Sequence, residues 1–348
     1  MKIAIIGAGF FGLATALKLR ESYKKADIQV FEKLNDILLG TSGKNQFRWH
    51  WGYHYPRSQE TAEECLNSYS SFKKYFGKFT LKSKNFYAIA AKGSLTKEEK
   101  FLEFCERNKL YCKKTNINVL KKDKISNTFE VKEEIIDIDL IRSHLKQILR
   151  KNKIQVNLSK KIKINEKFKE NFDYIVASTY SENSELLKEN IQENIKLQYV
   201  EKVIVKLPKD YKNLSIVILD GNFMCLDPYK NTNYTILGSV KESVHLEELG
   251  SKLRLSKIQR KYLTLNSVLN PKFSNFNKIN RLFNEYFKKF DSKFVKSFFV
   301  IRCTKYSKKD SRQSEITKKG KILKLFSGKW VSCFESADKI VKKISWKL

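Results

Sequence analysis

The segment 41-TSGKNQFRWHWGYHYPR-57 concentrates side chains that can do chemistry. It carries two of the chain's four histidines and two of its four tryptophans, together with lysine and arginine side chains. Such a mixture would suit a nucleic-acid clamp, a metal site, a packed aromatic core or a redox active site. A metal site is the weakest of the four, because no acidic residue or cysteine stands at ligand spacing from the histidines. The structural elements around this segment are therefore needed to choose among the other three kinds of site.

A glycine turn, 7-GAGFFG-12, lies upstream and is flanked by the elements of a nucleotide-binding unit. Hydrophobic periodicity predicts a strand at 2–6, a helix at 10–23 and a second strand at 28–32. Strand, glycine turn, helix and strand in this order form a βαβ unit.

Each glycine of the turn has a physical role in such a unit. Gly7 permits the tight turn, Gly9 lets the backbone approach a pyrophosphate, and Gly12 lets helix and strand pack closely. The phosphates then lie on the N–H groups at the positive end of the helix. Glu32 ends the second strand, where its carboxylate can accept hydrogen bonds from a ribose and disfavours the 2′-phosphate of NADP. The turn alone does not distinguish FAD from NAD.

Length and composition predict a folded protein of two domains. At 348 residues the chain exceeds the usual size of one core, and 41% of its residues are hydrophobic. No apolar run is long enough to span a bilayer, the N-terminus lacks the layout of a secretory signal, and the cysteines form no CxxC pair. We therefore expect a cytoplasmic protein with reduced thiols.

The net charge of +32 has two interpretations. The lysines are spread along the whole chain, which is typical of a solvated basic surface that follows compositional bias. Alternatively, the charge reflects a preference for anionic ligands. A nucleic-acid partner would rest on charge alone, since no known binding module is present, so none is expected. No transmembrane segment is expected, and peripheral contact with a membrane stays open.

Periodicity also predicts the remaining elements. Helices are expected at 59–76, at 95–109 with Thr96 as N-cap, at 139–152 and at 331–344, with a polar, mostly helical region up to about residue 290. Strands are expected at 84–91, 128–138, 154–158, 172–178, 199–207, 215–219, 234–240, 298–302 and 321–326.

The arrangement resembles the D-amino-acid-oxidase-like family of FAD-dependent oxidoreductases, which includes glycerol-3-phosphate and 2-hydroxyglutarate dehydrogenases. The resemblance covers the N-terminal βαβ unit with its following loop, the strand at 172–178, and the C-terminal strand, SGKW segment and helix. It implies an α/β fold in which a Rossmann-like FAD-binding domain is interleaved with an α+β substrate domain on a mostly antiparallel sheet. The division expected is 1–80, 135–185 and 298–348 for the FAD-binding domain, and 81–134 and 186–297 for the substrate domain.

The same resemblance implies which residues bind FAD. The loop 40-GTSGKNQ-46 would wrap the cofactor, and the segment 327–329 would open a helix that faces the flavin ring. Thr179 stands where the family has a glycine, so the backbone there must approach the cofactor differently. The cofactor residues expected are Gly7, Gly9, Phe10, Phe11, Gly12, Glu32, Lys33, Thr41, Ser42, Lys44, Asn45, Gln46, Thr179, Gly328, Lys329 and Trp330.

Beyond the wrapping loop, the chain should cross toward the reacting face of the flavin. His50, His54 and Tyr53 are the candidate catalytic residues there, with a histidine polarising or deprotonating the substrate. Arg302 ends a strand where relatives often bind a substrate carboxylate, and it is the expected anion anchor. Further substrate contacts expected are Arg48, Tyr55 and Tyr229, beside Asp227.

Several alternatives stay open for this segment. The tryptophans and Tyr53 could simply pack the junction between the domains while the histidines cap loops, or one histidine could attach covalently to the flavin. His144 and His245 lie in polar stretches and are expected to face solvent.

The function expected is an FAD-dependent oxidoreductase that transfers hydride to flavin N5. The hydride would come from a C–H next to a hydroxyl or amine of a small, anionic metabolite, and oxygen or another carrier would accept the electrons. The alternative is a flavin- or nucleotide-binding protein of the same fold without turnover, used as a scaffold or regulator.

Overall fold

A parallel β-sheet forms the nucleotide-binding half of the computed structural model, which describes residues 1–188, 195–220, 224–250, 252–305, 312–326 and 328–344. Its six strands run in the order β17-β18-β10-β1-β2-β9, and all neighbours except β17 and β18 are parallel. The strands are β1 (Lys2–Ile6), β2 (Asp27–Phe31), β9 (Gln155–Asn157), β10 (Tyr174–Ala177), β17 (Glu315–Lys319) and β18 (Ile322–Phe326). The nearly all-apolar β1 and β10 are neighbours inside the sheet, as strands covered on both faces should be.

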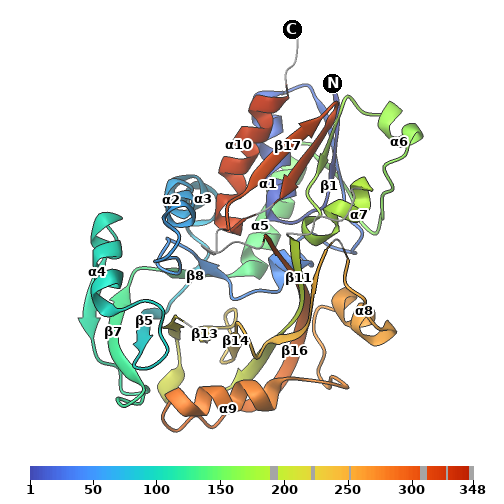
Figure 1. The fold of residues 1–348 in the computed structure, drawn as a ribbon. Helices are drawn as coiled ribbons and strands as arrows, with labels where there is room; N and C mark the ends of the chain where they lie inside the picture. Colours follow the sequence, from blue (N-terminus) through green and yellow to red (C-terminus); the bar gives the residue numbers. More distant parts are fainter. Residues whose placement is uncertain (189–194, 221–223, 251, 306–311, 327, 345–348) are drawn as a thin grey trace.

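Helices from both ends of the chain pack together on this half (Figure 1). Helix α1 (Phe10–Ser22) is apolar around most of its circumference because α10 (Cys333–Lys343) covers the side that the sheet leaves open. The other helices of this half and its connections are α2 (Gln59–Asn67), α3 (Tyr69–Phe76), α5 (Ile138–Lys151), α6 (Glu166–Glu170) and α7 (Asn183–Leu187).

A second, mostly antiparallel sheet of nine strands lies beside the first (Figure 1). Its order is β15-β11-β14-β13-β12-β5-β7-β6, with β16 paired along the other edge of β11 and one parallel pair, β5 and β12. The strands are β5 (Lys84–Ala90), β6 (Cys112–Thr115), β7 (Ile125–Val131), β11 (Ile195–Lys206), β12 (Leu214–Leu219), β13 (Met224–Pro228), β14 (Thr235–Ser239), β15 (Val244–Leu249) and β16 (Lys293–Lys305). Helices α4 (Glu98–Arg107), α8 (Lys257–Thr264) and α9 (Phe276–Tyr286) accompany it.

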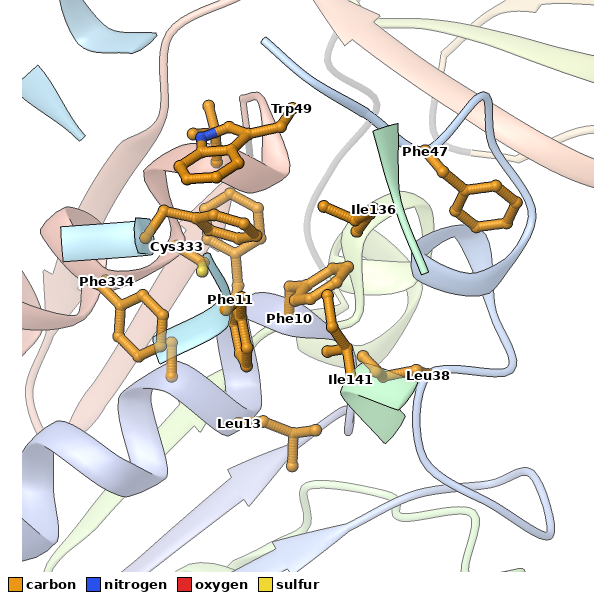
Figure 2. Packing of buried hydrophobic residues seen from close by; sticks show 14 of the residues in the cluster. Phe10, Phe11, Leu13, Leu38, Phe47, Trp49, Ile136, Ile141, Cys333 and Phe334 are labelled. Atoms are coloured by element: carbon orange, nitrogen blue, oxygen red, sulfur yellow. The ribbon is translucent and has the colours of Figure 1, made fainter. Parts of the chain in front are cut away.

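A small three-stranded sheet carries the aromatic segment between the two halves. Strand β3 (Arg48–Trp49) pairs with β8 (Glu134–Ile136), which also pairs with β4 (Thr80–Leu81). Trp49 is buried and stacks on Tyr69 with ring centroids 5.0 Å apart, and Figure 2 shows it in one cluster with Phe10 and Phe11 of α1. The aromatic half of the segment therefore packs a core, while its polar side chains stand on a fixed strand.

The fold class agrees with the sequence prediction, and several details differ. The region up to residue 290 is not mostly helical, since it holds β15 and two separate helices. Helix α4 begins later than predicted, with Lys97 as N-cap, because Thr96 is buried and its hydroxyl donates to Asp220 (2.7 Å). The predicted helix at 59–76 is interrupted at Ser68.

The two sheets draw on alternating stretches of the chain, as an interleaved division requires. The boundary expected at residue 298 falls inside β16, whose residues pair with β11 along its length. The domain division that we propose therefore assigns all of β16 to the nine-stranded sheet. Among the helices of the described residues, none is long and apolar enough to cross a membrane.

Candidate functional site

A cleft of about 780 Å³ runs from the glycine turn to the junction of the two large sheets. Its walls come from the β1–α1 turn, the loop after β2, the residues after β10, and strands β11, β13, β14 and β16. A cavity of this size, with a glycine turn at one end and titratable side chains at the other, is suited to a dinucleotide and a small second ligand.

At the turn, backbone geometry requires glycine at two positions. Gly7 has φ +105°, in the region that favours glycine. A Cβ on Gly12 would lie only 1.9 Å from the carbonyl oxygen of Gly7, so a side chain there has no room. Gly12 does not line the cleft; it acts by letting α1 start close to β1.

Two acceptors fix the loops against this turn. The Glu32 carboxylate accepts from the N–H groups of Ala8 (2.8 Å) and Leu34 (2.9 Å). Ser42 Oγ accepts from the N–H of Phe10 at the start of α1 (3.1 Å). The acid at the end of β2 and the loop at 41–43 therefore both meet the N-terminus of the helix, where a pyrophosphate is expected.

The wrapping loop is held by Asn45. Its amide donates to the carbonyls of Thr41 (3.1 Å) and Ser42 (3.0 Å), and its Oδ1 accepts from the N–H of Phe47 (2.6 Å). Lys44 lines the cleft, while its Nζ donates to the carbonyl of Leu263 (2.8 Å). Burial and Lys33 lower the pKa of Lys44 to about 8.

Gln46 supplies an unused acceptor at the junction. Its Nε2 donates to Asp227 (2.9 Å), whereas its buried Oε1 has no hydrogen-bond partner among the described residues. A buried acceptor without a donor is costly, so a ligand N–H would stabilise this site. The flavin ring carries such a donor, and with the glycine turn and the cationic lining the residues present fit FAD.

The C-terminal segment 328–330 also lines the cleft. Gly328 packs so tightly that a Cβ would lie 2.1 Å from the carbonyl oxygen of Arg312, and Trp330 stacks on Phe10 (centroids 5.2 Å apart). Burial lowers the pKa of Lys329 to about 8, and its Nζ lies 4.8 Å from the centre of the Tyr55 ring. Ser327 of the predicted motif lies outside the described residues.

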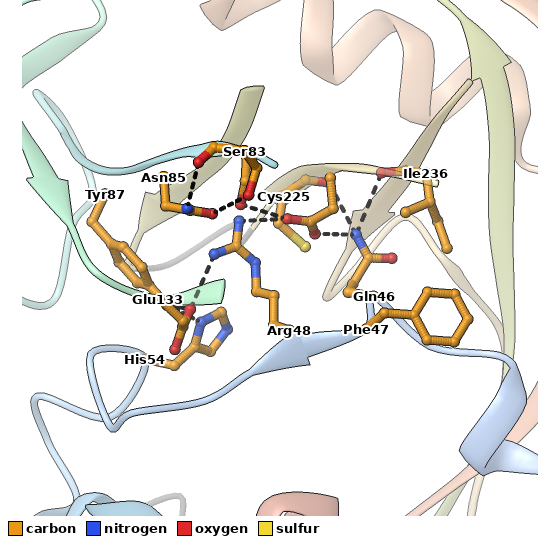
Figure 3. A network of polar contacts seen from close by, with 12 residues as sticks. Gln46, Phe47, Arg48, His54, Ser83, Asn85, Tyr87, Glu133, Cys225 and Ile236 are labelled. Atoms are coloured by element: carbon orange, nitrogen blue, oxygen red, sulfur yellow. Dashed lines mark hydrogen bonds and ion pairs between the residues drawn. The ribbon is translucent and has the colours of Figure 1, made fainter. Parts of the chain in front are cut away.

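Six polar side chains, those of Arg48, His50, His54, Tyr87, Glu133 and Asp227, form a network at the reacting end. Figure 3 shows Arg48, His54, Tyr87 and Glu133 in it. Glu133, between β7 and β8, accepts from Arg48 Nη1 (3.0 Å) and the Tyr87 hydroxyl (2.6 Å), and its other oxygen lies 3.3 Å from His50 Nδ1. His54 Nδ1 lies 3.1 Å from the same Tyr87 hydroxyl. Arg48 also pairs with Asp227 (2.7 Å), so one guanidinium joins two carboxylates on different elements.

Burial and charge set the protonation of this network. Burial would raise the pKa of Glu133, but His50, Arg48 and Tyr87 lower it to about 2. Burial would lower the pKa of Arg48, but Asp227, Tyr87 and Glu133 raise it above its usual value. Burial lowers the pKa of His50 despite Glu133, and burial with His50 and Lys329 holds the pKa of His54 far below its usual range. The cluster is thus an ion pair of Arg48 and Glu133 beside two neutral imidazoles.

His50, His54 and Glu133 also offer ligand atoms within 4.8 Å of one another, which is close enough for a metal. However, both Glu133 oxygens already accept protein hydrogen bonds, one from Arg48 and Tyr87 and the other from the Trp51 N–H (3.2 Å) beside His50. A cation would have to displace the arginine, so the geometry favours a hydrogen-bond network over a metal centre.

Most residues that the sequence analysis singled out line this cleft. All the expected cofactor residues do so except Gly12, and so do Arg48, His50, His54 and Arg302. Thr179 has φ −90°, which any residue adopts, so the missing glycine is accommodated there. Arg302 donates from Nε to Gln198 (2.6 Å) on the neighbouring strand β11.

Among the residues expected to act in catalysis or to contact substrate, Tyr53, Tyr55, Asp227 and Tyr229 do not line the cleft. Tyr53 is buried behind it and donates its hydroxyl to the carbonyl of Tyr111 (2.7 Å). Tyr55 lies beneath Lys329, and Tyr229 packs against Phe47. The prediction that His245 faces solvent is wrong, because its Nε2 pairs with the buried Glu201 at 2.8 Å.

Three polar residues of the site, Glu133, Tyr87 and Lys202, were not predicted from the sequence. Glu133, between β7 and β8, lies 83 residues from His50 in the sequence, and Tyr87 of β5 lies 33 residues from His54. Lys202 lines the cleft from β11, and burial lowers its pKa. The alternation in 199-YVEKVIVKL-207 puts Val200 and Lys202 on one face of the strand, which is the signal that could have identified Lys202.

Comparison with known proteins gives two kinds of match. Residues 2–130 match the model of a family described as FAD dependent oxidoreductase. The FAD-dependent monooxygenase kojA of Aspergillus flavus is 25% identical over 289 aligned residues, and the match covers 72% of this chain and 66% of the relative. The match thus spans a little under two thirds of that relative's length.

Solved structures match over nearly the whole chain. L-α-glycerophosphate oxidase from Mycoplasma pneumoniae, solved with FAD bound, has a TM-score of 0.70 at 14% identity, covering 100% of this chain and 95% of the other. Glycine oxidase from Geobacillus kaustophilus has a TM-score of 0.65 at 11% identity, covering 98% and 93%. At these identities the structural matches show the fold.

Proposed function

Because residues 2–130 match the model of an FAD-dependent oxidoreductase family, we propose that this protein uses FAD to oxidise a small anionic metabolite at a C–H next to a hydroxyl or amine. The observation that carries the proposal is the position of His50 and His54. Both line the same cleft as the glycine turn, at the end where the flavin ring is expected. A proton acceptor there can take the hydroxyl or amine proton while hydride leaves the adjacent carbon.

The residues that would hold the cofactor are those of the cleft's nucleotide end. Gly7, Gly9 and the N-terminus of α1 would receive the pyrophosphate, Glu32 the ribose, and Gln46 with Lys329 the ring. When bound, FAD supplies the hydride acceptor at N5.

The substrate side is cationic, which supports an anionic substrate. Arg302 and Lys202 lie on neighbouring strands, β16 and β11, with Val200 and Val300 between them in the wall of the cleft. The carboxylate or other anionic group would bind at Arg302, and the valines would exclude water from the reacting carbon. We propose that His50 and His54 act as acid and base, and that Arg48 supports them through Glu133 rather than by touching the substrate.

A cytoplasmic location is part of this proposal. None of the six cysteines is in a disulfide, as a reducing compartment would maintain. Oxygen or another carrier could reoxidise the flavin; the curated relatives are named as monooxygenases, which use oxygen.

The test is a flavin-bleaching panel on purified protein. We expect FAD to be released on denaturation, and the visible absorbance of the bound flavin to bleach anaerobically with one of a set of hydroxy acids, amino acids or sugar acids. Colourless protein that neither contains nor takes up FAD would refute the proposal. Flavin that is bound but bleached by dithionite alone would favour the scaffold alternative. Hydrogen peroxide formed on readmitting air would identify an oxidase.

A further inference from the structure

Glu133 is a buried carboxylate whose interactions all lie at the reacting end of the cleft. It is 0% exposed and accepts from the side chains of Arg48 and Tyr87 and from the backbone N–H of Trp51 (3.2 Å), in addition to its contact with His50. A carboxylate that receives this many donors is held in one orientation, because turning it would leave a buried donor unsatisfied. The Glu133 carboxylate therefore has a fixed orientation, and the side chains that contact it must form their hydrogen bonds to it in that orientation.

This arrangement determines the tautomer of His50. Arg48 is always charged and keeps Glu133 ionised, so the carboxylate has no proton to give. His50 Nδ1, 3.3 Å away, must therefore be the donor. In a neutral imidazole the lone pair then lies on Nε2, which is the form that can accept a proton.

The same carboxylate acts on His54 through Tyr87. The Tyr87 hydroxyl has one proton and gives it to Glu133 at 2.6 Å, which leaves its oxygen as an acceptor. His54 Nδ1, at 3.1 Å from that oxygen, must donate to it, so its lone pair also lies on Nε2. One buried carboxylate thus sets the protonation pattern of two imidazoles whose rings are 5.1 Å apart.

We propose that Glu133 is the positioning residue of this site: it fixes His50 directly, and His54 through Tyr87, as Nδ1–H tautomers that present Nε2 as the proton acceptor. The effect of Glu133 on turnover rests on the proposed function. The tautomers themselves are a property of the folded chain, and they can be measured without a substrate.

The charges that face the histidines give the direction of the pH effect. Arg48 on β3, Lys202 on β11 and Lys329 before α10 disfavour a protonated imidazole, and Asp227 is engaged by Arg48. Glu133 is the carboxylate that raises the pKa of His50 against burial. Removing its charge should lower the pKa of His50 further, so the acidic limb of the kcat/KM profile should move to lower pH.

The experiment compares Glu133→Gln with Tyr87→Phe in the full-length protein. Glutamine keeps the shape but turns one of the two accepting atoms into a donor. We expect its kcat/KM to fall by about 10²-fold or more, which is the usual contribution of a general base, with the acidic limb displaced to lower pH. Tyr87→Phe should leave the His50 tautomer unchanged. The tautomer of His54 should no longer be fixed, because the acceptor for its Nδ1–H is lost.

Tautomers are measured by two-bond ¹⁵N–¹H correlation spectra of histidine-labelled protein, for which four histidines must be assigned. Wild type should show Nδ1–H for His50 and His54. Finding His50 as the Nε2–H form or as imidazolium at neutral pH would overturn the proposal, as would an unchanged His50 tautomer in folded Glu133→Gln. If the tautomers are as proposed but no substrate bleaches the flavin, the proposed function fails while this inference stands.

Glu201→Gln is the matched control, and it also covers the case in which Glu133→Gln folds poorly. Glu201 is equally buried and accepts from His245, Ser274 and the Asn275 N–H, so its replacement should cost similar stability. It lies between Val200 and Lys202 on β11, and its side chain therefore points to the face away from the cleft. We expect its pH profile and the tautomers of His50 and His54 to be those of wild type; a shift like that of Glu133→Gln would assign the effect to lost stability and refute the proposal.

Discussion

Gly12 shows how strictly single residues are specified at the nucleotide end of the cleft. A Cβ there would lie 1.9 Å from the Gly7 carbonyl oxygen, which belongs to the backbone of the turn and cannot rotate away. At Gly40, in contrast, a Cβ would meet nothing within 4 Å, and φ is negative, at −74°. The two glycines stand close to the same cleft, but only one is required by packing.

We therefore expect Gly12→Ala to destabilise the protein by more than about 3 kcal/mol, the upper end of ordinary overpacking, since backbone must move. FAD content should fall with it, because the start of α1 is displaced from the turn. Gly40→Ala should stay within about 0.5 kcal/mol of the stability of wild type. Denaturant unfolding and the flavin-to-protein ratio measure both; equal stability of the two variants would contradict this account of the turn.

The residues near the turn could be predicted from sequence because their spacing is local. Gly7, Gly9, Gly12 and Glu32 fall within one βαβ unit, and geometry ties each to its neighbours. The role of Glu133 could not be predicted from the sequence. It depends on the pairing of β3 with β8, which brings residues more than eighty positions apart into contact. Nothing in the polar run around Glu133 distinguishes it from the solvated acids of the chain.

At the scale of elements, α5 begins at a defined cap. The Asp137 carboxylate accepts from the N–H groups of Asp139 (3.0 Å) and Leu140 (3.2 Å) and is 5% exposed. Its position directly after β8 means that the cap also fixes where that strand, and so Glu133, ends against the helix.

Asp137→Ala should cost about 1 kcal/mol, since two helix N–H groups lose their acceptor, whereas Asp137→Asn should retain most of the stability because asparagine caps equally well. Thermal or urea unfolding of the two variants measures the difference. Equal losses would mean that the charge of Asp137, rather than its cap geometry, stabilises the helix start.

Helices of this kind were predictable where one face is apolar over several turns, as in α5 and α10. Periodicity failed between β14 and β16, where short apolar pieces cover the nine-stranded sheet. Tyr262 of α8 and Phe273 pack against Phe299 there, so the pattern follows the contours of that sheet and not the period of a helix.

At the scale of the whole molecule, the excess of lysine and arginine is the dominant electrostatic feature. A net charge of +32 on one compact chain is self-repulsive and destabilises the folded state relative to the extended one. Ion pairs relieve part of it, for example Lys146 with Asp36 at 2.7 Å, but many cations face solvent. Both interpretations of the charge, a solvated surface and a preference for anions, predict that the stability of the protein changes with salt. Only a preference for anions predicts that the change depends on which anion is added.

Raising sodium chloride from about 0.01 M to about 0.1 M shortens the Debye length from about 30 Å to about 10 Å, and we expect the unfolding midpoint to rise because repulsion is screened. Sodium sulfate at the same ionic strength is the control: screening alone gives the same rise, whereas an additional rise that Arg302→Gln reduces would show anion binding at the substrate end of the cleft. Duplex DNA whose affinity falls steeply over the same range would instead revive a nucleic-acid partner. A midpoint that stays constant or falls as sodium chloride is added would show that self-repulsion does not limit the stability of this chain.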